Sequence, residues 1–142
     1  MFRGQVILVE DDDLQRKVYG DFLKANGFSV IPLRRGQEAV DFIEASPIEP
    51  ETVLLVILDI MMPGMDGFET CRQIRKIVGD SVPILFLTGG DRQMDLLHKA
   101  FAAGGDEYLL KDGRFNEFLQ CVRRWAGRSA KTSVTRPKLA VG

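Results

Sequence analysis

Asp59 is the residue of this chain whose position most clearly indicates a chemical role. It follows directly after the apolar run of residues 53–58 and opens a turn-forming segment, residues 60–67. A continuous run of valine, leucine and isoleucine is typical of a strand buried on both faces, as in a parallel sheet covered by helices. A carboxylate inside such a strand is costly to bury, whereas one at its carboxyl end emerges where open α/β sheets bind ligands. Asp59 is therefore a candidate nucleophile or metal ligand.

Three other predicted strands also end in polar side chains. Glu10 and Asp11 follow residues 6–9, Thr88 follows residues 83–87, and Lys111 follows residues 108–110. In a parallel sheet these groups would share one crevice with Asp59. Clustered carboxylates repel one another unless a cation neutralises them, and carboxylate oxygens with water are the ligands that Mg²⁺ prefers. Thr88 and Lys111 are better suited to hold the oxygens of an incoming phosphoryl group.

Each of these signals has an ordinary explanation when it is taken alone. Asp12 or Asp13 could simply cap the N-terminus of a helix. A threonine after a strand often forms a turn, and a lone lysine is usually solvated. The coincidence at four strand ends is what favours a functional site over these alternatives.

Short β-rich runs alternate with helical patterns five times along the chain. The predicted strands are residues 6–9, 29–33, 53–58, 83–87 and 108–110, and a helical spacing of apolar residues follows each. Such alternation predicts an α/β fold with a doubly wound five-stranded parallel sheet and helices on both faces, a flavodoxin-like (βα)5 arrangement. Pro32 fits only an edge strand, which the strand order 2-1-3-4-5 provides.

The composition bounds the class of protein. The 142 residues and the net charge of −1 suit one domain, which we place at residues 1–126, with a basic linker or tail at residues 127–142. The two cysteines, far apart, are expected to be reduced thiols. No apolar run approaches the roughly 20 residues of a membrane span, and no signal peptide is recognisable. We therefore expect a cytoplasmic protein with no membrane contact and no direct nucleic acid binding.

Four segments together resemble the receiver domain of two-component response regulators. They are residues 6–12 (VILVEDD), 58–67 (LDIMMPGMDG), 87–89 (LTG) and 103–111 (AGGDEYLLK), and the resemblance extends over about residues 4–126. It implies that Asp59 accepts a phosphoryl group from a sensor histidine kinase or a histidine phosphotransfer protein. It also implies that Asp11 binds Mg²⁺ directly, that Glu10 acts through water, and that the backbone carbonyl of Met61 completes the ligands.

The same resemblance assigns roles on the far side of the site. Thr88 and Lys111 would contact the phosphoryl oxygens, and Tyr108 matches the aromatic residue that turns inward when Thr88 moves. The face formed by the fourth helix, fifth strand and fifth helix would then control an output protein or domain, and a homodimer that forms on phosphorylation is a further expectation. Apart from accepting the phosphoryl group and losing it slowly, such a domain is not an enzyme.

Two positions depart from the pattern of the family. Asp112 stands where proline usually follows the lysine, and Gly89 stands where alanine is common after the threonine. Because a cis bond before a residue other than proline costs about 3–4 kcal/mol, we expect a trans Lys111–Asp112 peptide, with Asp112 capping the fifth helix. The glycine is expected to leave space beside the phosphoryl site.

Two other functions compete with this interpretation. A haloacid-dehalogenase-like phosphatase also uses a strand-end aspartate, a threonine, a lysine and Mg²⁺, but it places a second aspartate where this chain has Met61. A receiver-fold binding module that works without phosphorylation would be favoured if an acid, the threonine or the lysine were missing, and none is.

Overall fold

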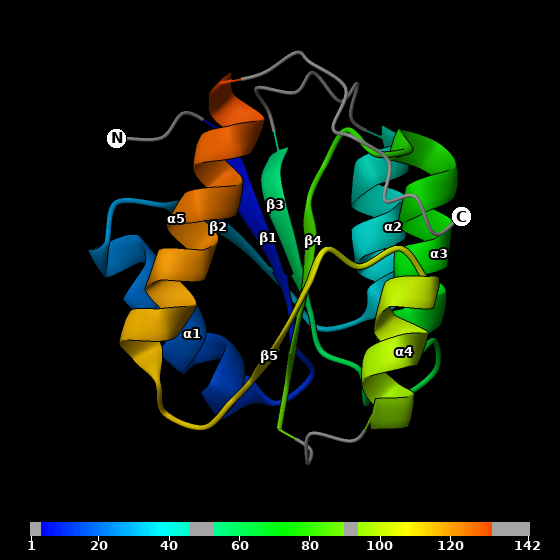
Figure 1. The fold of residues 1–142 in the computed structure, drawn as a ribbon, viewed down its shortest axis with the longest axis horizontal. Helices are drawn as coiled ribbons and strands as arrows, with labels where there is room; N and C mark the ends of the chain where they lie inside the picture. Colours follow the sequence, from blue (N-terminus) through cyan, green and yellow to red (C-terminus); the bar gives the residue numbers. More distant parts are fainter. Residues whose placement is uncertain (1–3, 46–52, 90–93, 132–142) are drawn as a thin grey trace.

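A parallel five-stranded sheet lies at the centre of the molecule (Figure 1). The computed structural model describes residues 4–45, 53–89 and 94–131. The strands are β1 (Gln5–Val9), β2 (Ser29–Leu33), β3 (Val53–Leu58), β4 (Ile84–Thr88) and β5 (Glu107–Leu110), in the order β2-β1-β3-β4-β5. Every neighbouring pair is parallel. The predicted sheet and strand order are confirmed.

Helices cover both faces of the sheet. Within the described residues they are α1 (Asp13–Ala25), α2 (Gly36–Ala45), α3 (Gly67–Val78), α4 (Met94–Ala102) and α5 (Phe115–Lys131). Figure 1 shows α1 and α5 on one side and α2, α3 and α4 on the other. This is the flavodoxin-like arrangement that the alternating pattern predicts. None of the described helices combines the length and the apolar character that crossing a bilayer requires.

Strand β3 is buried along its whole length, which explains its continuous apolar sequence. Val56 and Leu58 belong to the apolar layer beneath α2, α3 and α4, whereas Leu55 and Ile57 belong to the layer beneath α1 and α5. Because alternate side chains of a strand enter opposite layers, no position within β3 is open to a charged group. The first polar side chain after Val53 is therefore Asp59, at the carboxyl end.

Strand β2 lies at the edge of the sheet and pairs only with β1. Pro32 stands opposite Leu8 in that pairing. Proline lacks the N–H that a central strand would donate to a second neighbour, so the edge position is the one it tolerates. The prediction made from Pro32 is confirmed.

Helix α5 is longer than the sequence pattern indicates. It runs through Gly127 to Lys131, beyond the predicted domain boundary at residue 126. A single glycine costs an established helix only about 1 kcal/mol, so it does not end α5. The cation of Arg128, 5.0 Å above the ring of Trp125, packs along the extension. The first residues of the basic tail are thus helical, and residues 132–142 lie outside the described residues. The end that the sequence predicts for the second helix, near Pro47, also lies outside them.

Candidate functional site

The polar groups that follow the strand ends line one cleft of about 540 Å³ at the carboxyl edge of the sheet. Thr88 is the last residue of β4, whereas the sequence pattern places it directly after the strand. The residues that line the cleft are Glu10, Asp11, Asp12, Gln15, Asp59, Met61, Thr88, Gly89 and Lys111. The structure therefore brings together the acids, hydroxyl and amine that the sequence places at four separate strand ends.

Main-chain hydrogen bonds continue past the strands and fix these residues side by side. The Asp59 N–H donates to the Val9 carbonyl at 3.1 Å, and the Glu10 N–H donates to the Leu33 carbonyl at 3.0 Å. On the other side of the cleft, the Lys111 N–H donates to the Thr88 carbonyl at 2.8 Å. The side chains of these residues thus leave a main chain that is still held by the sheet, at Glu10, Asp59 and the Thr88–Lys111 pair.

Close packing of α3 also holds Asp59 in place. The Gly67 N–H donates to the Ile60 carbonyl at 2.9 Å, and Asp66 caps α3 by accepting from the Glu69 N–H at 2.9 Å. A Cβ atom at position 67 would lie 2.2 Å from the carbonyl oxygen of Asp59. Only glycine allows the start of α3 to approach the Asp59 main chain this closely.

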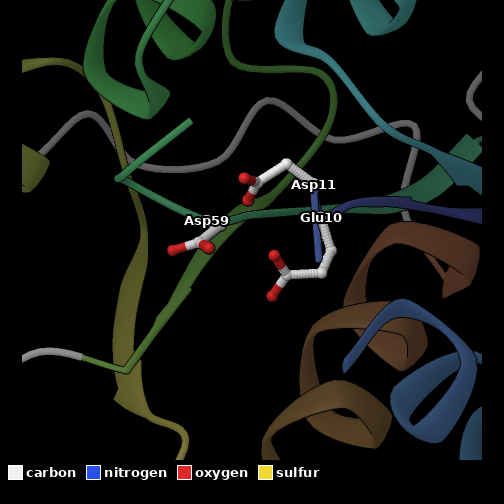
Figure 2. Close-up of side chains that lie close together, drawn as sticks. All are labelled: Glu10, Asp11 and Asp59. Atoms are coloured by element: carbon white, nitrogen blue, oxygen red, sulfur yellow. The ribbon is translucent and has the colours of Figure 1, made fainter. Parts of the chain in front are cut away.

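Three carboxylates face a common space (Figure 2). Glu10 and Asp11 come from the end of β1 and Asp59 from the end of β3, and each offers an oxygen within 4.8 Å of the other two. Glu10 and Asp59 are buried and Asp11 is half-buried. Carboxylate oxygens at this spacing fit a small divalent cation that prefers oxygen ligands, as Mg²⁺ does. Met61 also lines the cleft, although its side chain is exposed, and a ligand role for its carbonyl stays a prediction.

Lys111 bridges two of these acids. Its Nζ donates to Oε1 of Glu10 and, at 3.1 Å, to Oδ2 of Asp59. Burial raises the pKa of Glu10 to about 7, with the charge of Asp59 adding to the effect and Lys111 opposing it. Burial alone would lower the pKa of Lys111, but the hydrogen bond to Glu10 and the charges of both acids raise it above its usual value. Lys111 therefore stays charged and offsets part of the negative charge.

Backbone donors orient the remaining carboxylate oxygens. The Asp12 N–H donates to Oε2 of Glu10 at 3.2 Å, and the Ile60 N–H donates to Oδ1 of Asp59 at 2.7 Å. Asp12 is also the residue that caps α1, because its Oδ1 accepts from the Gln15 N–H at 2.9 Å. The choice left open by the sequence between Asp12 and Asp13 is thus settled for Asp12.

Thr88 and Tyr108 are both buried in this structure, at 2% and 7% exposure. Tyr108 stands opposite Phe86 and Leu110 opposite Thr88 in the pairing of β4 with β5. Thr88 thus reaches the cleft while the ring of Tyr108 lies in the apolar layer beneath α4. Their roles in switching stay predictions.

The two departures from the family pattern have different outcomes. The Lys111–Asp112 peptide is trans, as expected, since the described residues contain no cis bond. The expectation that Asp112 caps α5 is wrong. Its Oδ1 accepts from the Arg114 N–H at 3.2 Å, and the chain turns at Gly113, where φ is +84°. The helix starts only at Phe115. Beside Thr88, a Cβ at Gly89 would meet no atom of the described residues within 4 Å, so the expected space is present among them.

Two residues of α1 belong to the site although the sequence did not indicate them. Gln15 lines the cleft, and Arg16 donates from Nη1 to the Glu10 carbonyl at 3.0 Å. Both residues lie in the first turn of α1, which starts directly after the Asp12 cap and hence close in sequence to Glu10 and Asp11. A capping residue directly after a candidate acid pair is the signal that could have pointed to them.

The family model of the response regulator receiver domain matches residues 6–123. This chain belongs to that family. The match favours a receiver domain over a haloacid-dehalogenase-like phosphatase. Response regulator MprA of Mycolicibacterium vanbaalenii is 38% identical over 119 residues, which are 84% of this chain and 48% of MprA. The chain thus spans about half the length of the curated relatives it matches.

Solved receiver structures share the fold of this receiver domain. Response regulator TrrA from Thermotoga maritima, in complex with Mg²⁺ and BeF, has a TM-score of 0.74 at 28% identity, covering 86% of this chain and 98% of that chain. The receiver domain of Ssk1 from Saccharomyces cerevisiae, crystallised with the histidine phosphotransfer protein Ypd1, has a TM-score of 0.79 at 26% identity, covering 94% and 96% of the two chains.

Proposed function

We propose that Asp59 accepts a phosphoryl group from a sensor histidine kinase or a histidine phosphotransfer protein. The observation that carries this proposal is the position of Asp59, which opens into the cleft 3.1 Å from the Lys111 ammonium and beside two further acids. In the transfer, a carboxylate oxygen of Asp59 attacks phosphorus, and a P–O bond forms as the P–N bond of the phosphohistidine breaks. The histidine nitrogen keeps the electron pair of the broken bond.

Mg²⁺ is the cofactor that we expect at this site. Asp11, Asp59 and the Met61 carbonyl would hold it directly, and Glu10 would hold it through water. The oxygen-only donor set and its spacing support this choice. When bound, Mg²⁺ would neutralise the acids and help to orient the phosphoryl oxygens. The acids of this chain supply the binding charge, and their backbone hydrogen bonds keep them in place before the donor arrives.

Thr88 and Lys111 would hold the transferred group. The ammonium of Lys111 already lies beside Asp59, so it can offset part of the nearly two negative charges that a phosphoryl group adds. The buried Thr88 ends β4 at the cleft, where its hydroxyl can donate to a phosphoryl oxygen. Such preorganised donors contribute to transfer chiefly by positioning and charge balance.

Phosphorylation would then switch the face formed by α4, β5 and α5. Thr88 and Tyr108 lie on adjacent strands, so movement of Thr88 toward the phosphoryl group changes the packing available to the Tyr108 ring. A local change of charge would in this way bias a larger element between two arrangements.

We expect this domain to have two kinds of partner, a phosphoryl donor and an output target. The complex of the Ssk1 receiver domain with Ypd1 supports a histidine phosphotransfer protein or kinase as the donor. This chain spans about half the length of relatives such as MprA, so the downstream target of the signal is either an output domain or a separate protein. We expect this receiver domain to act in the cytoplasm and to form a homodimer on phosphorylation. We also expect it to catalyse nothing beyond its own phosphorylation and slow autodephosphorylation.

Incubation with acetyl phosphate and Mg²⁺, followed by intact-mass measurement, tests the proposal. One phosphoryl adduct is expected for the wild-type protein, and none is expected for Asp59→Asn or in the presence of EDTA. Asp66→Asn is a matched control, because Asp66 caps α3 outside the cleft. Equal labelling of Asp59→Asn would contradict the proposal, and a wild type that binds Mg²⁺ but takes up no phosphoryl group would favour the phosphorylation-independent binding module.

A further inference from the structure

We propose that Arg16 is a positioning residue for the acidic cluster, holding the Glu10 main chain so that the Glu10 and Asp11 carboxylates meet Asp59. This inference rests on the proposed function, because it concerns the same cation site. It goes beyond that function in assigning a role to a side chain of α1 that contacts none of the three carboxylates of the cluster in the described contacts.

The Arg16 side chain turns inward from an otherwise solvated turn of α1. Its guanidinium donates from Nη1 to the Glu10 carbonyl at 3.0 Å and from Nη2 to Oδ1 of Asp13 at 2.5 Å. The side chain is 14% exposed, whereas that of Lys17, the next residue, is 73% exposed. A planar guanidinium can bridge two acceptors in this way, which a single ammonium does less well.

The carbonyl that Arg16 holds belongs to the peptide between Glu10 and Asp11. That peptide is planar, so its orientation sets the directions in which both side chains leave the main chain. The Glu10 N–H is fixed independently, by the Leu33 carbonyl at 3.0 Å. With both of its main-chain groups fixed, Glu10 can rotate little, and Asp11 starts from a fixed peptide.

Charge and geometry predict opposite effects for the loss of Arg16. As a nearby positive charge, Arg16 repels a divalent cation, so its removal would strengthen Mg²⁺ binding. As a positioning residue, its removal would loosen the Glu10–Asp11 peptide and weaken Mg²⁺ binding. Groups that orient metal ligands typically account for roughly ten- to hundredfold in metal affinity. The sign of the change therefore separates the two roles.

Helix stabilisation is the other role that Arg16 could have. Its pair with Asp13 joins residues three apart on α1, and the Asp13 side chain is 76% exposed. Exposed pairs of this kind contribute little to folding. An Asp13→Asn variant removes the ionic partner and leaves the donor to the Glu10 carbonyl in place, so it isolates this role.

Calorimetric titration of the full chain with Mg²⁺ tests the proposal. For Arg16→Met the dissociation constant is expected to rise roughly ten- to hundredfold. Arg16→Lys keeps the charge but not the two-pronged geometry, and it should lie between Arg16→Met and the wild type. Lys17→Met removes a neighbouring positive charge that is paired with Asp21, so it should bind Mg²⁺ as the wild type does or more tightly. Asp13→Asn removes only an exposed carboxylate and should bind Mg²⁺ as the wild type does.

Phosphorylation by acetyl phosphate gives a second readout that a purely structural role would not move. The Mg²⁺ concentration for half-maximal rate should rise in Arg16→Met, and the rate at saturating Mg²⁺ should return toward that of the wild type. Binding by Arg16→Met as tight as that of the wild type, or tighter, would overturn the proposal. If Arg16→Met does not fold, wild-type affinity in Arg16→Lys would overturn it equally. Failure of the wild type itself to bind Mg²⁺ would instead remove the proposed function, and this inference with it.

Discussion

The ammonium of Lys111 lies 3.1 Å from Oδ2 of Asp59, although the two residues are 52 positions apart in the chain. It also donates to Glu10. In the absence of a metal ion, this one cation offsets the charge of the buried acids. Both acids belong to the cluster that could hold a divalent cation, so we expect Lys111 and Mg²⁺ to compete for their negative charge.

Replacing Lys111 with methionine tests that relationship. Without the ammonium, the Glu10 and Asp59 carboxylates lose their partner, and breaking a buried pair from one side costs about 3–5 kcal/mol. Protonation of Glu10 will offset part of this loss, so we expect a fall of about 2 kcal/mol in the free energy of unfolding measured by urea. Added Mg²⁺ should restore most of it and should bind more tightly than to the wild type. An equal loss with and without Mg²⁺ would contradict the account.

The pKa of Glu10 predicts how stability changes with pH. Burial raises it from 4.5 to about 7, so the folded protein holds this proton more tightly than the unfolded chain does. The stabilisation is complete below the unfolded pKa and is lost as the pH rises through about 7. The Mg²⁺-free protein should therefore lose up to about 3 kcal/mol between about pH 5 and pH 8. Glu10→Gln should remove this slope, and a slope that persists in that variant would assign it to another group.

Gly67 is predicted to be intolerant of even a methyl group. A Cβ there would lie 2.2 Å from the Asp59 carbonyl oxygen and 2.8 Å from the Ile60 Cα, both of which are backbone. Overpacking against backbone costs about 1–3 kcal/mol, so Gly67→Ala should lower the thermal midpoint and slow phosphorylation by displacing Asp59. Gly20→Ala, on α1, is the control, because among the described residues the added Cβ would meet the Leu8 side chain at an ordinary contact distance of 3.8 Å. That control should be neutral or stabilising by up to about 1 kcal/mol.

The alternating apolar pattern was sufficient to predict most of the fold. In β3 each residue is buried, so the run from Val53 to Leu58 leaves Asp59 as the first polar position. Parallel strands place their carboxyl ends at one edge, and that geometric rule brings Glu10, Thr88 and Lys111 to the same cleft. These inferences need only the period of a strand and the direction of the chain.

Other parts of the site depend on contacts that leave no periodic signal. The hydrogen bond from Arg16 goes to a main-chain carbonyl, which every residue possesses, so nothing in the sequence marks its partner. Gly67 is one of two glycines in residues 60–67, and only the packing of α3 on Asp59 shows its role. Asp112 has the side chain of a capping residue, but the turn at Gly113 moves the start of α5 away from it.

Switching is predicted to affect one face of the molecule more than the other. Thr88 ends β4, and Tyr108 lies on the neighbouring strand β5, opposite Phe86. We therefore expect a change at the cleft to reach α4 and β5 first. Hydrogen exchange with beryllofluoride and Mg²⁺, a phosphoryl mimic, should therefore differ most between residues 89 and 111. Asp59→Asn, which cannot form the adduct, should show no such change. Changes confined to α1 and α2 would contradict this route.

The most direct measurement of the central claim is the identity of the phosphorylated residue. Borohydride converts an aspartyl phosphate to homoserine, which peptide mass spectrometry locates at a single position. After incubation with Mg²⁺ and a phosphorylated histidine phosphotransfer protein, we expect homoserine at residue 59 and at no other acid. Homoserine at residue 11 or 12 in place of residue 59 would contradict the assignment of Asp59 as the phosphoacceptor.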